Sequence, residues 1–221
     1  ILQRQELFSG TYIGKNPTYD AGKYLVLKLN FSSVDETNLE ESFNEVINSS
    51  ISKFSEKYHK AGLLDNPVEI DDKDCMSSFS DLASEARLSN QKLSLIVDDV
   101  DAFNNRLLMK VIAEKGLNKA GYEEFRKREG STLRHFGRVL KSASKSCLYR
   151  IFFTGVLPVR WADGFSSSLD IVYDRTHTNS FQDTFGFKSS DIEELLTTMF
   201  PHLSAKDKKQ HLKQIQEKSN G

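Results

Sequence analysis

Three aspartates follow an apolar segment near the middle of the chain. Residues Leu93 to Val97 read LSLIV, and Asp98, Asp99 and Asp101 come directly after them. Charges at the end of a buried strand are costly unless a cation or several hydrogen-bond donors meet them. Magnesium, which prefers carboxylate and other oxygen ligands, would answer that need. The sequence therefore predicts a magnesium-dependent site at the carboxyl end of this segment.

Thr154 and Gly155 end a second apolar segment, Cys147 to Phe153. In nucleoside triphosphatases, one acid at a strand end holds the magnesium shell and the next polarises the attacking water, while a polar residue on an adjacent strand senses the γ-phosphate. Asp98, Asp99 and Thr154 fit these three places. We therefore predict Asp98 as the metal ligand, and Asp99 and Thr154 as catalytic residues.

Other interpretations of the acidic cluster stay open. Asp98 and Asp101 could simply cap the following segment, because turn aspartates accept backbone N–H bonds. Asp99 and Asp101 also form a D-x-D pair of the kind used by magnesium-dependent phosphotransfer enzymes, although no second acidic strand end accompanies it. A response-regulator receiver domain is disfavoured, because it needs an aspartate on an intervening strand and none occurs between Asp101 and Asp163.

The segments that would position these residues alternate between strand and helix patterns. Strands are expected at Lys23 to Phe31, Leu93 to Val97, Cys147 to Phe153 and Leu169 to Tyr173. Helices are expected at Asp35 to Tyr58, through Phe79, Leu82 and Ala86, at Phe125 to Ala143, at Ser190 to Met199 and, thinly buried, in the tail from Ser204. The run LSLIV is typical of a central strand covered on both faces. This pattern predicts an α/β fold with a parallel sheet flanked by helices, which binds ligands at the carboxyl ends of its strands.

Length and composition narrow the class of protein. The 221 residues suit one main domain, which we place at 1–200, with a helical tail at 201–221. Thirty basic and thirty-one acidic residues leave no net field for nucleic acid or an anionic membrane, and the apolar stretches are too short for a transmembrane helix. Cys75 and Cys147 lack nearby metal-ligand partners, so we expect buried thiols and an intracellular location, cytoplasmic or nuclear.

Five segments in order resemble the AAA-ATPase-like domain family, a P-loop class often found with a restriction-endonuclease-like nuclease domain. They are LFSGTYI at 7–13, LVLKLNFSS at 25–33, LIVDDVDAF at 95–103, FFTGVLPV at 152–159 and TFGFKSSDIEELL at 184–196. The resemblance spans about residues 5 to 200. It implies a Walker B strand end at Asp98 and Asp99 and a sensor at Thr154. It also implies Mg²⁺ and ATP as ligands and a nuclease or other effector domain as a partner in a longer product.

The chain departs from the family in two places. The family's Walker A loop should precede Leu7, and the chain begins after that point. The family usually carries glutamate where this chain has Asp99, whose shorter side chain would hold a water about one methylene further away. We therefore expect a truncated or degenerate domain of the AAA type that is inactive as this chain.

The missing segment has a structural consequence. In this class the strand leading into the Walker A loop lies between the sensor strand and the last strand, so the fold should be incomplete at its N-terminal end. Either the chain is a fragment of a longer product, or another segment fills a gap in the sheet. A non-catalytic interaction scaffold without nucleotide is the alternative function, and a magnesium-dependent phosphotransfer enzyme is a weaker one. A glycine-lysine loop upstream would favour the enzyme over the scaffold.

Overall fold

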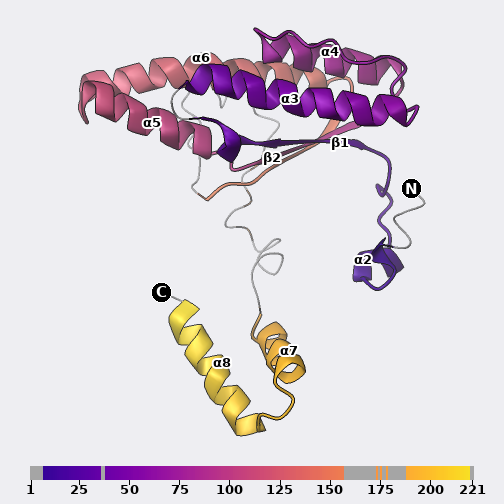
Figure 1. Cartoon of the computed structure of the whole chain (residues 1–221), viewed down its shortest axis with the longest axis vertical. Coiled ribbons are helices and arrows are strands. Elements are labelled where there is room, and N and C mark those ends of the chain that lie inside the picture. Colours follow the sequence, from indigo (N-terminus) through magenta and orange to yellow (C-terminus); the bar gives the residue numbers. More distant parts are fainter. Residues whose placement is uncertain are drawn as a thin grey trace. The chain divides into compact units, whose positions relative to one another are not determined.

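The protein is described here from a computed structural model, which covers residues 7–35, 38–156, 173, 175, 178 and 188–219. The chain divides into two compact units, Ile1–Val172 and Tyr173–Gly221. The first unit holds the sheet and most of the helices, and the second holds two helices (Figure 1). The predicted boundary at residue 200 stays a prediction.

A three-stranded parallel sheet forms the centre of the first unit. Its strands are β1 (Leu25–Asn30), β2 (Leu93–Asp98) and β3 (Leu148–Phe153), with β2 in the middle. Asn30 lies opposite Asp98, and Val97 lies opposite Phe153, so the three carboxyl ends are level. The α/β fold with a parallel sheet flanked by helices is confirmed.

Four long helices connect the strands. They are α3 (Leu39–Lys60) and α4 (Cys75–Leu88) between β1 and β2, and α5 (Ala102–Lys115) and α6 (Lys119–Ser144) between β2 and β3. A short helix, α2 (Tyr12–Lys15), precedes β1, and a 3₁₀ turn, η1 (Phe31–Ser33), follows it. Among the helices of the described ranges, none is long and apolar enough to cross a membrane.

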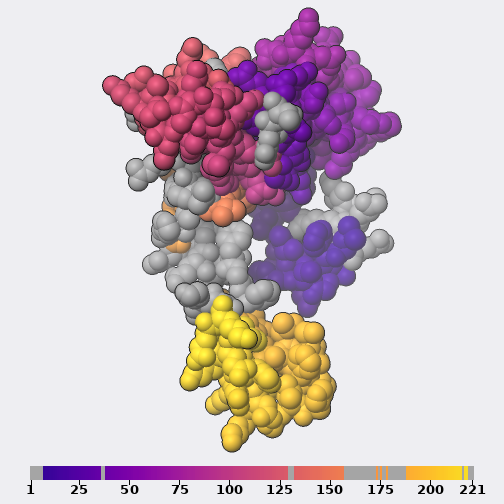
Figure 2. All heavy atoms as spheres, turned by 60° about the vertical axis from the view of Figure 1, so that its left-hand side comes forward, coloured from indigo at the N-terminus to yellow at the C-terminus, as the bar shows by residue number. Residues whose placement is uncertain are grey.

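The four long helices all cover the same face of the sheet (Figure 1). Crossovers between parallel strands are almost always right-handed, and here both advance in the same direction, from β1 to β2 to β3. The connecting helices must then gather on one side. In the space-filling view they form one closely packed body (Figure 2).

Phenylalanine rings fill the space between this helix layer and the sheet. Phe43 on α3 is the centre of the cluster, with ring centroids 5.0 Å from Phe31, 4.9 Å from Phe103 and 6.1 Å from Phe136. All four rings are buried. The cluster therefore joins η1, α3, α5 and α6 through one set of side chains.

Only one face of β2 is covered, so the prediction that both faces are covered is wrong for the described part of the chain. Leu93, Leu95 and Val97 are buried, whereas Ser94 and Ile96 are half-exposed. The apolar run correctly indicates a middle strand. It does not indicate on which side the helices lie, because that depends on the direction of the crossovers.

Helix α5 is missing from the sequence-based expectation, and α6 begins at Lys119 rather than at Phe125. The periodic pattern of apolar residues is weak between β2 and Phe125, because some of the apolar side chains there face solvent. Met109 is 66% and Leu117 is 87% exposed. Gly121, which suggests a loop in the sequence, lies in the first turn of α6, where its N–H donates to the Asn118 side chain at 3.0 Å.

The second unit consists of α7 (Ser189–Met199) and α8 (Ala205–Ser219). Both predicted helices are confirmed, although α7 begins one residue before the expected Ser190. The Asp191 carboxylate accepts a hydrogen bond from the backbone N–H of Lys188 at 2.9 Å. The strand predicted at Leu169 to Tyr173 lies outside the described residues, except for Tyr173, which is not in a strand.

Replacement of the central ring tests the core. Phe43→Ala leaves a cavity that four elements share, and we expect the free energy of unfolding to fall by about 3–5 kcal/mol. Denaturant unfolding followed by circular dichroism measures this loss. The control is Met109→Ala on α5, which removes an exposed side chain and should change the stability by less than about 0.5 kcal/mol. Equal losses in the two variants would contradict this description of the core.

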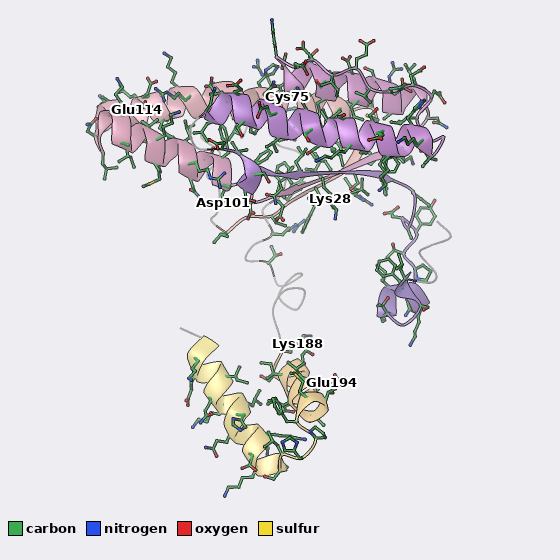
Figure 3. The ribbon with its side chains drawn as sticks, viewed as in Figure 1. Lys28, Cys75, Asp101, Glu114, Lys188 and Glu194 are labelled. Atoms are coloured by element: carbon green, nitrogen blue, oxygen red, sulfur yellow. The ribbon has the colours of Figure 1, made fainter. Side chains whose placement is uncertain are left out.

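The two cysteines are free and buried, as the sequence predicts. Cys75 lies at the start of α4 (Figure 3), and its burial raises the pKa of its thiol to about 12. Burial also raises the pKa of the Cys147 thiol, directly before β3. A raised pKa keeps the unreactive thiol form dominant at neutral pH.

We therefore expect the folded protein at pH 8 to resist a thiol reagent and the denatured protein to react at both cysteines. Because the folded pKa of Cys75 exceeds its ordinary value of 9.0, the contribution of this group to stability is complete below about pH 9 and is lost as the pH rises toward 12. Labelling at pH 8 with and without denaturant, read by mass spectrometry, measures the protection. Rapid labelling of the folded chain would contradict it.

Candidate functional site

The carboxyl ends of β2 and β3 bring two of the predicted site residues into contact. Asp98 is the last residue of β2, and Thr154 follows β3. The backbone N–H of Thr154 donates to the carbonyl of Val97 at 2.9 Å, which continues the ladder to the end of the strand. The Thr154 hydroxyl then donates to the Asp98 carboxylate. A carboxylate and a hydroxyl from neighbouring strands thus form one polar pair.

Asp99 lies in a sharp turn immediately after the strand. Its φ is +52°, in the left-handed region that aspartate adopts more readily than most residues. Its backbone N–H donates to the Asp98 carboxylate at 3.2 Å, and its carbonyl accepts from the N–H of Ala102 at 2.9 Å. The turn ends the strand geometry at Asp98 and leads directly into α5.

Asp101 is the most buried of the three acids, with 6% of its surface exposed. It occupies the N-cap position of α5, yet its carboxylate makes no capping bond to that helix. One carboxylate oxygen accepts from the N–H of Val156 at 3.2 Å, and the other accepts from the amide of Asn105 at 3.2 Å. Asp101 therefore joins the turn after β2 to the loop after β3. Because both of its carboxylate oxygens already accept hydrogen bonds, a metal site formed by Asp99 and Asp101 is disfavoured.

A second bond joins the same two segments, because the N–H of Val100 donates to the carbonyl of Thr154 at 2.9 Å. Gly155 lies between the two connections. A Cβ at this position would lie 2.5 Å from the Asp101 carboxylate, which is too close for any side chain. Two contacts thus explain why threonine and glycine follow β3. Thr154 supplies the hydroxyl that bonds to Asp98, and Gly155 leaves room for the Asp101 carboxylate.

Arg106 is a further residue of this edge that the sequence did not single out. Its guanidinium donates to the carbonyl of Ser32 at 2.9 Å and to the carbonyl of Val34. These bonds hold the chain leaving β1 against α5. No local sequence pattern reveals them, because the partners are more than seventy positions apart.

The oxygens of Asp98 and Thr154 are of the chemical kind that binds magnesium. Asp98 is exposed and its neighbour Thr154 supplies a hydroxyl. Proteins usually hold Mg²⁺ with one or two carboxylates and leave the other positions to water and phosphate oxygens. Within residues 7–35, 38–156 and 188–219, no group of three or more His, Cys, Asp or Glu side chains is arranged to hold a metal.

The close approach of Gly155 to Asp101 can be tested by substitution. Gly155→Ala forces the two segments apart, and we expect a loss of stability of about 1–3 kcal/mol. Thermal unfolding measures the loss, and Gly10→Ala is the control because no atom lies within 4 Å of a Cβ added there.

A double-mutant cycle with Asp101→Ala isolates the contact. Removing the carboxylate also removes the clash, so the double variant should be less destabilised than the sum of the two single variants. Additive losses would show that Gly155 is required for another reason.

Comparison with known families identifies the family to which the chain belongs. The model of a family described as "Predicted AAA-ATPase" matches residues 2–165, well over half of the chain. No curated protein and no solved structure matches significantly. The matched region contains the three described strands and the pair formed by Asp98 and Thr154, and these parallel strands in sequential order are compatible with a P-loop NTPase-like fold. The chain belongs to the AAA-ATPase-like family.

Proposed function

We propose that this chain supplies the acidic part of a magnesium–ATP site. Asp98 holds the magnesium shell, Asp99 orients the attacking water, and Thr154 senses the γ-phosphate. The observation that carries the proposal is the hydrogen bond from the Thr154 hydroxyl to the Asp98 carboxylate, across level ends of parallel strands. Membership of the AAA-ATPase-like family supports it.

The single proton of the Thr154 hydroxyl suggests how this residue senses the γ-phosphate. A hydroxyl donates only one hydrogen bond at a time, and in this structure Asp98 accepts it. A phosphate oxygen that took the bond would release the Asp98 carboxylate to turn toward a cation. Magnesium, when bound, neutralises charge on the phosphates. Thr154 thereby couples the position of the phosphate to the orientation of the metal ligand.

Asp99 is the weaker part of the site. Its side chain is one methylene shorter than the glutamate of the family, so it would hold a water less closely. We infer slow hydrolysis, with nucleotide binding as the main property. The turn at Asp99 also favours a short acid, because a left-handed backbone suits aspartate better than longer side chains.

The phosphates need additional donors. The 221 residues contain no G-x-x-x-x-G-K-[ST] sequence. In our proposal a phosphate-binding loop comes from another segment of a longer product, whose strand would pair with β3, the outer strand of the described sheet. A nuclease or other effector domain in that product would respond to whether nucleotide is bound.

Titration with a fluorescent ATP analogue and magnesium tests the proposal. Without the loop we expect weak, saturable binding, with a dissociation constant on the order of 1 mM. Asp98→Ala should weaken it at least about tenfold, because the carboxylate is the only charged member of the pair. Asp81→Ala on the exposed side of α4 is the control and should bind as the unaltered chain does.

The alternative outcome also has a clear meaning. If the folded chain shows no saturable binding, or if Asp98→Ala and Asp81→Ala bind equally, the proposal fails. A scaffold that keeps the fold without nucleotide would then be the better description.

A further inference from the structure

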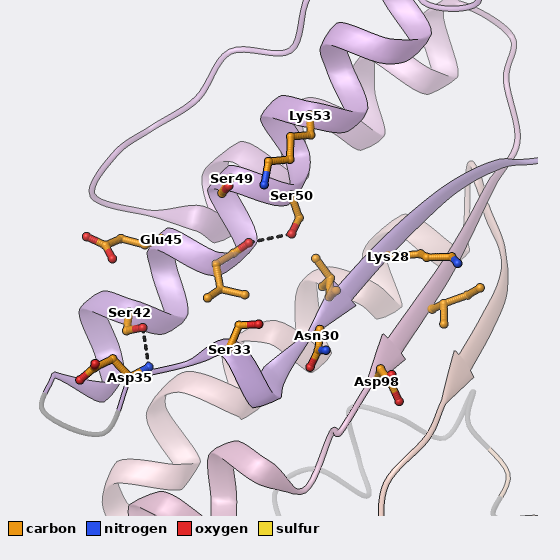
Figure 4. Close-up of a pocket in the computed structure, with 13 residues that line it drawn as sticks. Lys28, Asn30, Ser33, Asp35, Ser42, Glu45, Ser49, Ser50, Lys53 and Asp98 are labelled. Atoms are coloured by element: carbon orange, nitrogen blue, oxygen red, sulfur yellow. Dashed lines mark hydrogen bonds between the residues drawn. The ribbon is translucent and has the colours of Figure 1, made fainter.

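A polar trench with a volume of about 760 Å³ runs between α3 and the outer edge of β1 (Figure 4). Its walls carry Lys28 and Asn30 from the strand and Glu45, Ser49 and Lys53 from the helix. It reaches Asp98 at one end. Hydroxyl, amide and charged groups of both signs therefore face the same elongated space.

The edge of β1 adds main-chain groups to this space. The N–H of Leu25 donates to the carbonyl of Lys92 on the β2 side at 2.8 Å, so the odd-numbered residues of β1 bond to β2 and the even-numbered ones face outward. The outward N–H of Val26 donates to the Tyr58 hydroxyl at 3.1 Å. Beyond it, the outward N–H and C=O of Lys28 lie beside the trench, and no other described strand pairs with this edge.

The two ends of the trench differ in charge. Because α3 runs antiparallel to β1, Lys53 lies toward the start of the strand and Glu45 toward its end, while Lys28 and Asp98 lie on the other side of β1 from α3 (Figure 4). None of these four side chains is in an ion pair with a described residue. Glu45 and Lys53 are eight positions apart on one helix, which is about 12 Å along its axis.

We propose that the trench binds an extended peptide segment that pairs with the edge of β1. The segment carries an acidic side chain toward Lys53 and a basic side chain toward Glu45. At about 3.3 Å per residue, a separation of about 12 Å corresponds to charged residues four positions apart, and such residues point to the same face of a strand. Main-chain bonds give the affinity of such strand addition, and side-chain pockets give the specificity.

Lys28 also explains why the edge is selective. A lysine on an edge strand discourages pairing with arbitrary strands. A strand that is accepted at this edge must make up for that cost, and its charged side chains opposite Lys53 and Glu45 do so. The trench binds its segment through Lys53 and Glu45 and without nucleotide, so this inference does not depend on the proposed role of Asp98, which borders both sites.

Fluorescence anisotropy with labelled peptides tests the inference. The probe is a blocked peptide of about eight residues, alternating threonine and valine, with glutamate and arginine four positions apart; both orders of the charges are used. We expect saturable binding of one order. Lys53→Glu should weaken it at least about tenfold, and replacing the glutamate of the peptide by lysine should restore it. The control is Lys145→Glu, which makes the same charge change at the exposed end of α6.

Main-chain pairing is tested separately. A peptide with proline at alternate positions keeps both charges but lacks the N–H groups that would bond to β1, and it should not bind. Circular dichroism of each variant verifies folding. Binding of the proline peptide, equal weakening by Lys53→Glu and Lys145→Glu, or no binding to the unaltered chain would each overturn the proposal.

Discussion

Parallel pairing of β2 with both neighbours is the constraint on which the rest of this structure depends. Parallel strands cannot be joined by tight turns, so each connection must return along the full length of the sheet, and here helices do this. The same pairing aligns Asn30, Asp98 and the residue after Phe153 at one edge. The polar pair of Asp98 and Thr154 is a direct result of that alignment.

The helix layer and the polar edge have different physical roles. Burial of the phenylalanine cluster around Phe43 drives the helices onto the sheet, because apolar area removed from water is the largest favourable contribution to folding. The polar edge adds directional bonds instead. Asp101 holds the loop after β3, and Arg106 holds the chain after β1, so the segments around Asp98 are positioned from both sides.

One face of the sheet that the described helices leave uncovered, and the two outer strands of the described sheet, are the places where other segments can act. On that face Ile96 of the middle strand is half-buried and Phe152 of β3 is 44% exposed. The outer edge of β3 is the place for the strand that our proposed ATP site requires. The outer edge of β1 differs, because Tyr58 and Lys28 already restrict what can pair there.

Much of the fold was determined by the sequence alone. The strands, the long helix α3 and the acidic end of β2 all appear as local patterns of period two or period 3.6, and local patterns can be recognised without knowing the rest of the chain. Helix α5 was missed because its apolar residue Met109 is exposed and departs from the periodic pattern, and α6 was shortened because Gly121 suggested a loop.

Only the tertiary structure decided the partners of the polar side chains and the side on which the helices gather. Asp98 and Thr154 are 56 positions apart, and Asp101 and Val156 are 55 apart. Such pairs form because parallel strands become neighbours after their crossovers pack, and the burial that drives this packing is not specific to particular partners. The sequence by itself therefore determined which residues are polar at the strand ends, while packing of the whole unit determined which of them meet.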